Sequence, residues 1–548
     1  MLDVDNLGNG QNMTDGVYFI GIDVGTGSAR AGVFDEKGTC LATGKQDIRL
    51  YREAHQMVEQ SSTDIWQAVC ASVRGAMHAC AIAPEQVAGI GFDATCSLVV
   101  LGDGGASLAV GPSEDNLRDV IVWMDHRAVD EAERINTLGH SVLHYVGGRI
   151  SPEMQTPKLL WLKENRPATF ASAWQFFDLA DFLTWRATGD LARSTCTVTC
   201  KWTYLAHEQR WDPSYFQEIG LGELTQENFS RIGQTIVEPG TPVGDGLTPA
   251  AALELGLVPG TPVSAGMIDA HAGGIGTVGI GGQPERNLGY VFGTSSCTLT
   301  STRDPVFVPG VWGPYYSAMV PGMWLNEGGQ SAAGAAIDHL LAFHPSYPEA
   351  LELARAKGES LPLFLSKCAE ERLRTASDAV TLAAGLHVVP EFLGNRAPFA
   401  DPHARAVVAG LGMERDLDHL LALYVAGLCG IGYGLRQILE AQSQAGADVE
   451  QIVISGGAGQ SLFVRQILAD ASGKTIIAPL TAEPVLLGGA MLGATASRSF
   501  DTLNDAMRAM SQAGAAYEAC TGALRTVHDR RYEAFKALQG ALRAARDC

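Results

Sequence analysis

Two glycine-tipped turns carry residue types that could bind an anion. The first is Asp23-Val24-Gly25-Thr26-Gly27-Ser28, which ends an apolar run. Glycines let the N–H groups of such a turn point into a cleft, and the hydroxyls add donors, so the turn could hold a phosphate. A carboxylate beside a phosphate is repulsive unless a divalent cation lies between them. Asp23 therefore predicts a Mg²⁺ site next to a phosphate site.

A second turn of the same kind lies far downstream. In NLGYVFGTSSCTLTST, an apolar run ends in Gly293-Thr294-Ser295-Ser296, and a β-branched run follows. Each turn joins two strand-like runs, so both predict β-hairpins. A single hairpin of this kind is a common structural feature, but two with the same Gly-Thr tip indicate a chain built of two similar halves.

Asp269, in AGMIDAHAGG, ends another apolar run and precedes several glycines. A carboxylate that projects from a strand end toward a glycine-lined cleft can accept the proton of a hydroxyl nucleophile. We therefore expect Asp269 to be a general base that works near its ordinary pKa; the alternative is an N-cap for the next helix. In IVISGGAGQS, Gly456 and Gly457 could let an adenine or a ribose lie against bare backbone, although a plain strand-to-helix connection gives the same pattern.

Other familiar site patterns are incomplete. Arg30 stands where a dinucleotide fingerprint needs a glycine, and Leu468 stands where a Walker A loop needs one. Gly473, which would belong to that loop, is better explained as a helix C-cap. Cys196 and Cys200 are spaced like two metal ligands, but without a second Cys or His pair nearby they predict a structural role. The sequence contains neither HExxH nor GxSxG, so zinc-peptidase and serine-hydrolase functions are not supported.

The elements that must position these residues alternate between strands and helices. The predicted strands lie at 20–24, 29–34, 87–100, 452–455 and 475–478, and the predicted helices at 159–165, 331–342, 461–471 and 529–545. This alternation indicates an α/β fold. The segment 259–270 carries Pro and Gly where a crossover between the halves could lie.

Length, composition and charge exclude several classes of protein. The chain has 548 residues, of which 46% are apolar and 18% charged. This length predicts several domains or two large ones, and the composition excludes wholesale disorder. The net charge of −21 predicts no nucleic-acid partner and no anionic membrane surface. The longest uncharged apolar stretch, 420–434, is shorter than the about 20 residues that cross a bilayer, so it predicts a buried helix.

The cysteines and the N-terminus indicate the compartment. The eleven cysteines are odd in number and mostly far apart, which does not fit a disulfide framework. Residues 1–15 are polar and acidic and lack the cationic start and apolar run of a secretory signal. We therefore expect reduced thiols, a cytoplasmic protein and a disordered N-terminal tail over residues 1–15.

Six segments resemble the FGGY family of carbohydrate kinases, and together they extend over essentially the whole length from Tyr18 onward. They are IDVGTGSAR (22–30), WMDHR (123–127), KLLWLKEN (158–165), GMIDAHAGG (266–274), YVFGTSS (290–296) and ISGGAGQS (454–461). The resemblance implies an α/β fold of two ribonuclease H-like domains, the actin and sugar-kinase superfold, around a hinged cleft. The paired hairpins indicate the same duplication independently. We predict a sugar-binding domain at 16–270 and an ATP-binding domain with terminal helices at 271–548.

The resemblance also implies the roles of individual residues. Asp269 matches the family's general base, and Asp23 faces the metal ion and the phosphates. The residues expected to bind the nucleotide are Thr26, Gly27, Ser28, Arg30, Gly293, Thr294, Gly334, Asp338, Gly456, Gly457 and Ser461. The residues expected to bind the sugar are Asp93, Ala94, Lys201 and Glu327. Lysine can donate to sugar oxygens, glutamate can accept from a hydroxyl pair, and a small alanine leaves room for the carbon chain.

Within the family, the loop Thr95-Cys96-Ser97-Leu98-Val99 is most similar to that of D-ribulokinases. Glycerol kinases carry an Arg-Glu pair there, and xylulokinases a Gln-Met-His run. The resemblance implies phosphorylation of a ketopentose, above all D-ribulose, at its C5 hydroxyl, with ATP and Mg²⁺, by an enzyme that is often a homodimer. L-ribulose, D-xylulose and ribitol stay open as acceptors, because side chains read only a few hydroxyl configurations. An actin-like or chaperone-like ATPase, from a different functional class, shares the superfold and also stays open.

Overall fold

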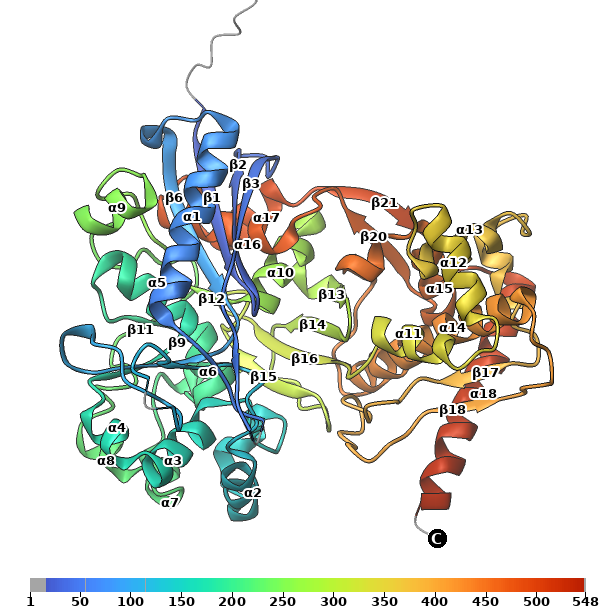
Figure 1. The fold of residues 1–548 in the computed structure, drawn as a ribbon, viewed down its shortest axis with the longest axis horizontal. Coiled ribbons are helices and arrows are strands. Elements are labelled where there is room, and N and C mark those ends of the chain that lie inside the picture. Colours follow the sequence, from blue (N-terminus) through green and yellow to red (C-terminus); the bar gives the residue numbers. More distant parts are fainter. Residues whose placement is uncertain (1–15, 55, 114, 547–548) are drawn as a thin grey trace, which may run out of the picture.

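Two mixed β-sheets form the centres of the two halves of the molecule (Figure 1). The computed structural model describes residues 16–546 except 55 and 114. The tail predicted at 1–15 lies outside the described residues. The cysteines among the described residues are free thiols, as the absence of a disulfide pattern predicts.

The first sheet has the strand order β12-β6-β1-β2-β3. Its strands are β1 (Tyr18–Val24), β2 (Ser28–Phe34), β3 (Cys40–Asp47), β6 (Val87–Ala94) and β12 (Met267–Ile268). Strand β2 is antiparallel to both of its neighbours, whereas β1, β6 and β12 are parallel. Strands β1 and β6 are buried along almost their whole length, which is typical of parallel strands covered on both faces. The hairpin predicted around Gly25-Thr26-Gly27 is confirmed.

The second sheet repeats this arrangement and adds a strand at each edge. Its order is β15-β16-β14-β13-β19-β20-β21. The strands are β13 (Asn287–Phe292), β14 (Ser296–Thr302), β15 (Trp312–Tyr316), β16 (Trp324–Gln330), β19 (Gln451–Ser455), β20 (Thr475–Pro479) and β21 (Ala513–Tyr517). As in the first sheet, the opening hairpin β13–β14 and the next strand β16 are antiparallel, and β19 and β20 are parallel to β13. The predicted duplication is confirmed.

Within the described residues, three smaller sheets and eighteen α-helices complete the fold. The small-sheet strands are β4 (Tyr51–Arg52), β5 (Val58–Gln60), β7 (Leu98–Leu101), β8 (Val120–Ile121), β9 (Gln175–Asp178), β10 (Arg193–Ser194), β11 (Ile236–Val237), β17 (His387–Val389) and β18 (Val407–Ala409). The helices up to residue 278 are α1 (Ser62–Cys80), α2 (Val129–Leu138), α3 (Gln155–Asn165), α4 (Pro167–Ser172), α5 (Leu179–Thr188), α6 (Thr195–Trp202), α7 (Pro213–Glu218), α8 (Gly222–Gln226), α9 (Pro249–Leu255) and α10 (Asp269–Val278). The later helices are α11 (Gly334–Ala342), α12 (Tyr347–Ala356), α13 (Leu361–Glu370), α14 (Leu417–Gln444), α15 (Leu462–Ser472), α16 (Pro484–Ala496), α17 (Leu503–Met510) and α18 (Gly522–Arg546).

Helix α14 is the long apolar helix that the stretch 420–434 predicts, although it extends further in both directions. By length and composition it could cross a membrane, but 72% of its most apolar window is buried inside the protein. It shares an apolar core with strands β13 and β19 and with Tyr532 and Phe535 of α18. The packing of α18 on the second half is confirmed, and Gly473, with φ of 75°, ends α15 as the predicted C-cap.

Helices α16 and α17 follow the second half in sequence but pack on the first sheet. In Figure 1 they are drawn in orange beside the blue strands β1 and β6. Close approach depends on glycine, since a Cβ added at Gly91 of β6 would lie 2.2 Å from the carbonyl oxygen of Gly489 in α16. Their side chains belong to the first half's apolar core. The boundary predicted at residue 270 stays a prediction, and this packing crosses it.

Candidate active site

Three carboxylates lie at the carboxyl ends of adjacent parallel strands. Asp23 of β1 is directly opposite Asp93 of β6, and Asp269 follows Ile268, which pairs with Ala94. Parallel strands bring their carboxyl ends to one edge of a sheet, which is where α/β proteins bind ligands. Asp23 is 5% exposed and Asp93 is fully buried. The first sheet therefore gathers three acidic groups that are far apart in the sequence.

Arg30 connects this acidic edge to the segment before α16. Its Nε donates to Asp23 Oδ2 at 2.9 Å, and its Nη1 donates to Glu483 Oε2 at 2.9 Å. Arg30 lies on β2, directly across the hairpin from Asp23 in the sheet register. The guanidinium thus offsets part of the negative charge at a point where segments from both ends of the chain meet.

Both carboxylate oxygens of Asp93 are buried without a hydrogen-bond partner among the described residues. Burial, followed by the charges of Asp23 and Asp269, raises the pKa of Asp93 well above its ordinary value. Buried polar atoms are nearly always paired, so two unpaired oxygens call for an explanation such as a bound ion. A hard cation with oxygen ligands would satisfy them.

Asp269 is the first residue of α10, with Ile268 as the N-cap, so the N-cap alternative does not describe it. One of its oxygens accepts a hydrogen bond of 2.7 Å from the N–H of Ala270. Burial and the charge of Asp23 raise the pKa of Asp269 to about 6. The expectation of an ordinary pKa is therefore wrong, because the neighbouring carboxylate and the loss of water both disfavour the ionised form.

Lys201 of α6 and Glu327 of β16 are buried charges from different halves of the chain, 5% and 8% exposed. The ammonium of Lys201 lies 5.1 Å from the ring centre of Trp312 on β15. Burial alone would lower the pKa of Lys201, but Cys96 and Glu327 raise it well above its ordinary value. The charge of Lys201 also acts on Asp269. These predicted sugar-site residues are thus brought into one charged neighbourhood, close to the fully buried Ala94.

His271 joins Cys196 of α6 to Glu327. Its Nδ1 lies 3.1 Å from Cys196 Sγ, and its Nε2 lies 3.3 Å from Glu327 Oε2. The sulfur also accepts the N–H of Ile268 at 3.4 Å. Burial by itself would raise the pKa of Glu327. The hydrogen bond from His271 and the charge of Lys201 outweigh burial and lower that pKa to about 2. Burial would raise the pKa of Cys196, but the Cys200 thiol and His271 lower it. Burial would likewise lower the pKa of His271, but Cys196 and Glu327 raise it. His271 therefore keeps Glu327 ionised.

The two glycine-tipped turns are held differently. In the first, the N–H of Gly25 donates to Ser28 O at 3.1 Å, and Trp123 Nε1 donates to Thr26 Oγ1 at 2.9 Å. In the second, the carbonyls of Gly293 and Thr294 accept the first N–H groups of α11, including that of Gly334 at 2.9 Å. A side chain added at Gly27 would meet nothing within 4 Å, so space is open beside that turn.

A cavity of about 410 Å³ brings together four of the predicted nucleotide residues. Those four are Gly334, Asp338, Gly457 and Ser461. Tyr424, Leu428 and Phe292 supply apolar walls, and Asp338 is an exposed residue on the rim whose pKa is raised because neighbouring atoms exclude part of the water around it. Gly456 has φ of 91°, and a Cβ there would lie 2.5 Å from Phe292 O, so the strand-to-helix turn requires glycine. A mostly apolar cavity with a few polar groups is typical of a small-molecule site.

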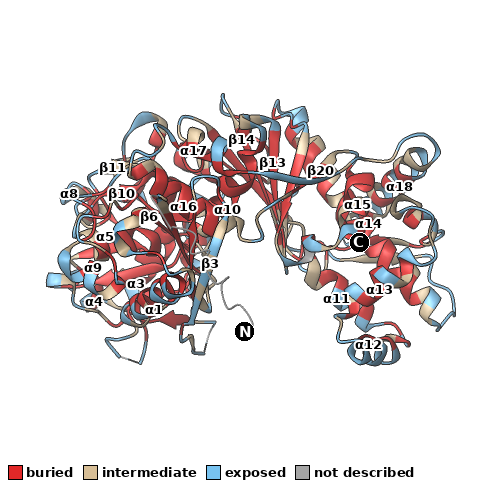
Figure 2. Ribbon diagram, turned by 90° about the horizontal axis from the view of Figure 1, so that it is seen from above, coloured by how far each residue is buried: buried red, intermediate tan, exposed pale blue. Residues whose placement is uncertain are grey.

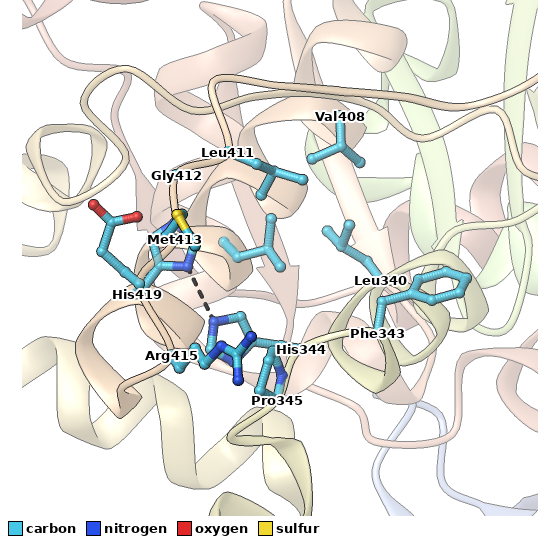
Figure 3. Close-up of a pocket in the computed structure, with 12 residues that line it drawn as sticks. Leu340, Phe343, His344, Pro345, Val408, Leu411, Gly412, Met413, Arg415 and His419 are labelled. Atoms are coloured by element: carbon cyan, nitrogen blue, oxygen red, sulfur yellow. Dashed lines mark hydrogen bonds between the residues drawn. The ribbon is translucent and has the colours of Figure 1, made fainter.

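A second cavity, of about 400 Å³, lies at the other end of α11 (Figure 3). Leu340 and Phe343 line one side and Leu411 lines another, and His344 forms a hydrogen bond of 3.0 Å with His419. The residues that line it do not include the predicted site residues. It is therefore separate from the nucleotide cavity.

Comparison with known families identifies the chain. Residues 18–276 match the N-terminal domain of the FGGY family of carbohydrate kinases, and residues 288–497 match its C-terminal domain. A human FGGY carbohydrate kinase domain-containing protein is 45% identical over 508 residues, covering 91% of this chain and 92% of that protein. The chain belongs to the FGGY family of carbohydrate kinases. Kinases of this family use ATP as the phosphate donor.

The chain is also similar to a curated D-ribulokinase in sequence and to solved sugar kinases in fold. A D-ribulokinase of Saccharomyces cerevisiae is 38% identical over 519 residues, covering 88% of this chain and 72% of that protein. A xylulose kinase from Rhodospirillum rubrum has the same fold, with a TM-score of 0.79 at 21% identity over 96% of this chain and 99% of that one. The glycerol kinase of Plasmodium falciparum with ADP gives a TM-score of 0.75 at 16% identity over 97% and 98%. The predicted two-domain sugar-kinase fold is confirmed.

Sequence reasoning about this FGGY kinase missed several site residues. His271 stands two residues after Asp269, and that proximity was the available signal. Cys196, for which the spacing predicts a structural role, lies against His271, and that role stays a prediction. Trp312 and Arg396, whose guanidinium lies 5.9 Å from the Trp312 ring centre, belong to no motif that singles them out. Only the folded chain brings them to the site.

Proposed function

We propose that this FGGY kinase transfers the γ-phosphate of ATP to the C5 hydroxyl of an open-chain ketopentose, with D-ribulose preferred, in the cytoplasm. The observation that carries the proposal is the convergence of partly exposed Asp269 with the buried charges of Lys201 and Glu327, beside the carboxylates Asp23 and Asp93. Such a set can orient a polyhydroxylated substrate and accept one proton from it. The likeness to the yeast D-ribulokinase supports the choice of sugar.

In this proposal the sugar lies between the two charged side chains of the pocket. Lys201 donates to oxygens of the ketose, and Glu327, kept ionised by His271, accepts from a pair of hydroxyls. Ala94 offers a small side chain where the carbon chain passes. Asp93 is fully buried, directly opposite Asp23 in the sheet register, so its assignment as a sugar ligand stays a prediction.

The nucleotide occupies the second half in this proposal. Its adenosine enters the cavity lined by Gly334, Asp338, Gly457 and Ser461. Its phosphates lie between the two glycine-tipped turns, where the N–H groups and hydroxyls of Thr26, Gly27, Ser28 and Thr294 supply donors together with Arg30. Gly293, whose N–H donates to Ser295 O at 2.9 Å, shapes the second turn. Gly456, whose positive φ sets the turn after β19, brings that backbone to the cavity wall.

The carboxylates fit a Mg²⁺ ion that accompanies ATP. The unpaired buried oxygens of Asp93 and the neighbouring carboxylate of Asp23 are the hard oxygen ligands that this ion prefers. Bound there, Mg²⁺ would neutralise negative charge on the phosphates. Asp23 and Asp93 would hold it.

Asp269 is the proposed general base. It orients the C5 hydroxyl toward the γ-phosphate and takes the hydroxyl proton as the new O–P bond forms and the bond to the ADP leaving group breaks. Phosphoryl transfer has a loose transition state, so positioning and charge neutralisation matter more than a strong base. A carboxylate with a pKa of about 6 is largely ionised near neutral pH and serves this purpose.

A panel of acceptors tests the substrate. Initial rates with D-ribulose, L-ribulose, D-xylulose and ribitol are ranked by kcat/KM, and ³¹P–¹³C couplings of the product locate the phosphate. We expect D-ribulose to rank first and to be phosphorylated at C5. Another acceptor at the top would replace D-ribulose and leave the sugar-kinase activity intact. ATP hydrolysis that no sugar or polyol changes would favour the actin-like or chaperone-like ATPase instead.

A further inference from the structure

A second group of metal-ligating side chains lies in the second half, outside the active site. Asp470 of α15, Cys520 before α18 and His528 of α18 each offer one ligand atom, and these atoms lie within 4.8 Å of one another. Asp470 and His528 are each 1% exposed, and Cys520 is half-buried. A carboxylate, a thiol and an imidazole at this separation are the donor set of zinc sites.

The partners of Asp470 leave one of its oxygens available. Oδ1 accepts the N–H of Cys520 at 2.7 Å and Gln466 Nε2 at 3.0 Å. Oδ2 is buried without a hydrogen-bond partner, although the Ser377 hydroxyl and the Cys520 thiol lie nearby. An unsatisfied buried carboxylate oxygen is costly, so it points to a ligand in this place.

His528 is oriented as a metal-binding histidine would be. Its Nδ1 lies 2.9 Å from the hydroxyl of Tyr433 on α14, and donation of the Nδ1 proton to that oxygen leaves the Nε2 lone pair free. Metal-ligating histidines nearly always use their second nitrogen in this way. The hydrogen bond that orients His528 comes from Tyr433, which is not one of the three proposed ligands. It is therefore an observation separate from the distances among the three ligand atoms.

The surrounding charges permit a cation with a thiolate ligand. Arg525 is paired with Asp529 through an N–O distance of 2.5 Å and donates to Asp470 O, while Arg531 donates to the carbonyls of Ala383 and Leu386. Burial and the neighbouring Asp470 raise the pKa of the Cys520 thiol to about 12 against the opposing charge of Arg525, so the thiol gives up its proton only as a metal ion binds. One thiolate and one carboxylate balance the two positive charges of Zn²⁺.

We propose that Asp470, Cys520 and His528 bind a zinc ion that fastens α18 to α15 and α14. Zinc–ligand bonds of about 2.0–2.3 Å in a tetrahedral arrangement would draw the three atoms together by up to about 1.5 Å. Thiolate and imidazole donors disfavour Mg²⁺ and Ca²⁺, and a water completes the coordination. Half-buried Cys520 provides access from solution. This site is independent of the proposed kinase chemistry.

Metal content and cobalt spectra test the site directly. The full-length chain, with any affinity tag removed, is saturated with Zn²⁺, desalted and assayed for bound zinc. We expect one zinc per chain, and Co²⁺ in its place should give a thiolate-to-cobalt charge-transfer band in the near ultraviolet. Absence of both zinc and the band would overturn the proposal.

Matched variants assign the ligands. Cys520→Ser and His528→Gln should each weaken zinc binding at least about tenfold, and Tyr433→Phe should weaken it by about 10- to 100-fold through the orientation of His528. Cys368→Ser and His387→Gln change a half-buried cysteine and histidine outside the cluster and should leave zinc binding unchanged. Equal zinc affinity in Cys520→Ser and wild type would contradict the site.

A measurement on the wild type covers the case in which a variant does not fold. Mass spectrometry after brief thiol alkylation reports the modification of Cys520, with Cys368 as the internal reference. Zinc should slow alkylation of Cys520 at least about tenfold without changing Cys368, because a metal-bound thiolate is shielded. Equal alkylation of Cys520 with zinc and with chelator would also overturn the site.

Discussion

Asp269 owes its chemical character to two neighbours that the fold supplies. The burial of its side chain and the nearby charge of Asp23 both disfavour the ionised carboxylate, and the N–H of Ala270 partly opposes them. His271, two residues later in α10, helps to lower the pKa of Glu327 and so keeps that carboxylate ionised. The two carboxyl groups would have similar pKa values in water. In the fold, Asp269 can accept a proton near neutral pH, whereas Glu327 stays an anion.

Asp269→Asn should lower kcat by about 10²- to 10⁴-fold, because the amide cannot accept the hydroxyl proton. Binding of a non-hydrolysable ATP analogue should stay intact, since Asp269 is not among the residues lining the nucleotide cavity. Steady-state kinetics and calorimetry check both. Asp103→Asn, at an exposed aspartate of the same half, is the control. If Asp269→Asn kept more than half of the wild-type kcat, Asp269 would not be the base.

The pH profile of kcat follows from the raised pKa of Asp269. A pKa of about 6 means that the protonated fraction grows as the pH falls through that value. The protonated acid cannot act as a base, so kcat should fall below about pH 6 and level off above about pH 7. Direct measurement of ADP release at saturating substrates reports this. A profile that stays flat to about pH 5 would show that Asp269 titrates like an exposed aspartate.

His271→Gln tests the link between the general base and the sugar pocket. Loss of the charged hydrogen bond to Glu327 should raise KM for the sugar by about 10- to 100-fold and change kcat less. His78→Gln, at an exposed histidine of α1, should leave KM unchanged. A sugar KM in His271→Gln within twofold of wild type would assign His271 a structural role only.

At the scale of elements, glycines decide how closely α16 approaches the first sheet. A Cβ at Gly91 would lie 2.2 Å from the carbonyl oxygen of Gly489, and one at Gly21 would also overlap the backbone of α16 at Leu486. Flexible side chains could move aside, but backbone cannot. Glycines therefore serve helix-to-sheet packing as well as the two turns proposed to bind phosphate.

Gly91→Ala should destabilise the protein by about 1–3 kcal/mol, because the added methyl group has no space. Gly75→Ala is the matched control, since its Cβ would lie 3.8 Å from Gly44 Cα, an ordinary contact, inside α1. There the substitution should be neutral or stabilising by up to about 1 kcal/mol. Urea midpoints compare the two. Equal midpoints for Gly91→Ala and wild type would mean that α16 can shift away.

At the scale of the molecule, the site is completed by contacts between the two halves. The ion pair of Arg30 with Glu483 and the contact of His271 with Glu327 each join segments that are far apart in the sequence. Figure 2 shows the two lobes on either side of the central elements α10, β13 and β14. The homodimeric state implied by the family resemblance stays a prediction, since a single chain is described.

D-ribulose together with a non-hydrolysable ATP analogue should close the cleft, because the proposed substrates contact both halves. Small-angle scattering should then show a smaller radius of gyration than for the free protein, and nucleotide alone should produce less of the change. If closure requires the bound sugar, it would also limit the hydrolysis of ATP by water in the absence of sugar. An unchanged radius with both ligands bound would indicate that the free protein is already closed.

Local patterns in the sequence were sufficient to predict several features. The two hairpins, the glycine-tipped turns, the strand before Asp269 and the buried helix around 420–434 all depend on residues close together in the chain. Periodicity and glycine act over a few residues, so they can be interpreted without the fold. The family resemblance added the sugar-kinase superfold, which the two matching sheets confirm.

Tertiary structure alone decided the rest. The opposition of Asp23 and Asp93, the contact of His271 with Cys196 and Glu327, and the return of α16 and α17 to the first half all join residues distant in sequence. The raised pKa of Asp269 could not be foreseen either. Burial and neighbouring charge set that pKa, and both arise only when separate strands bring their carboxyl ends to one edge.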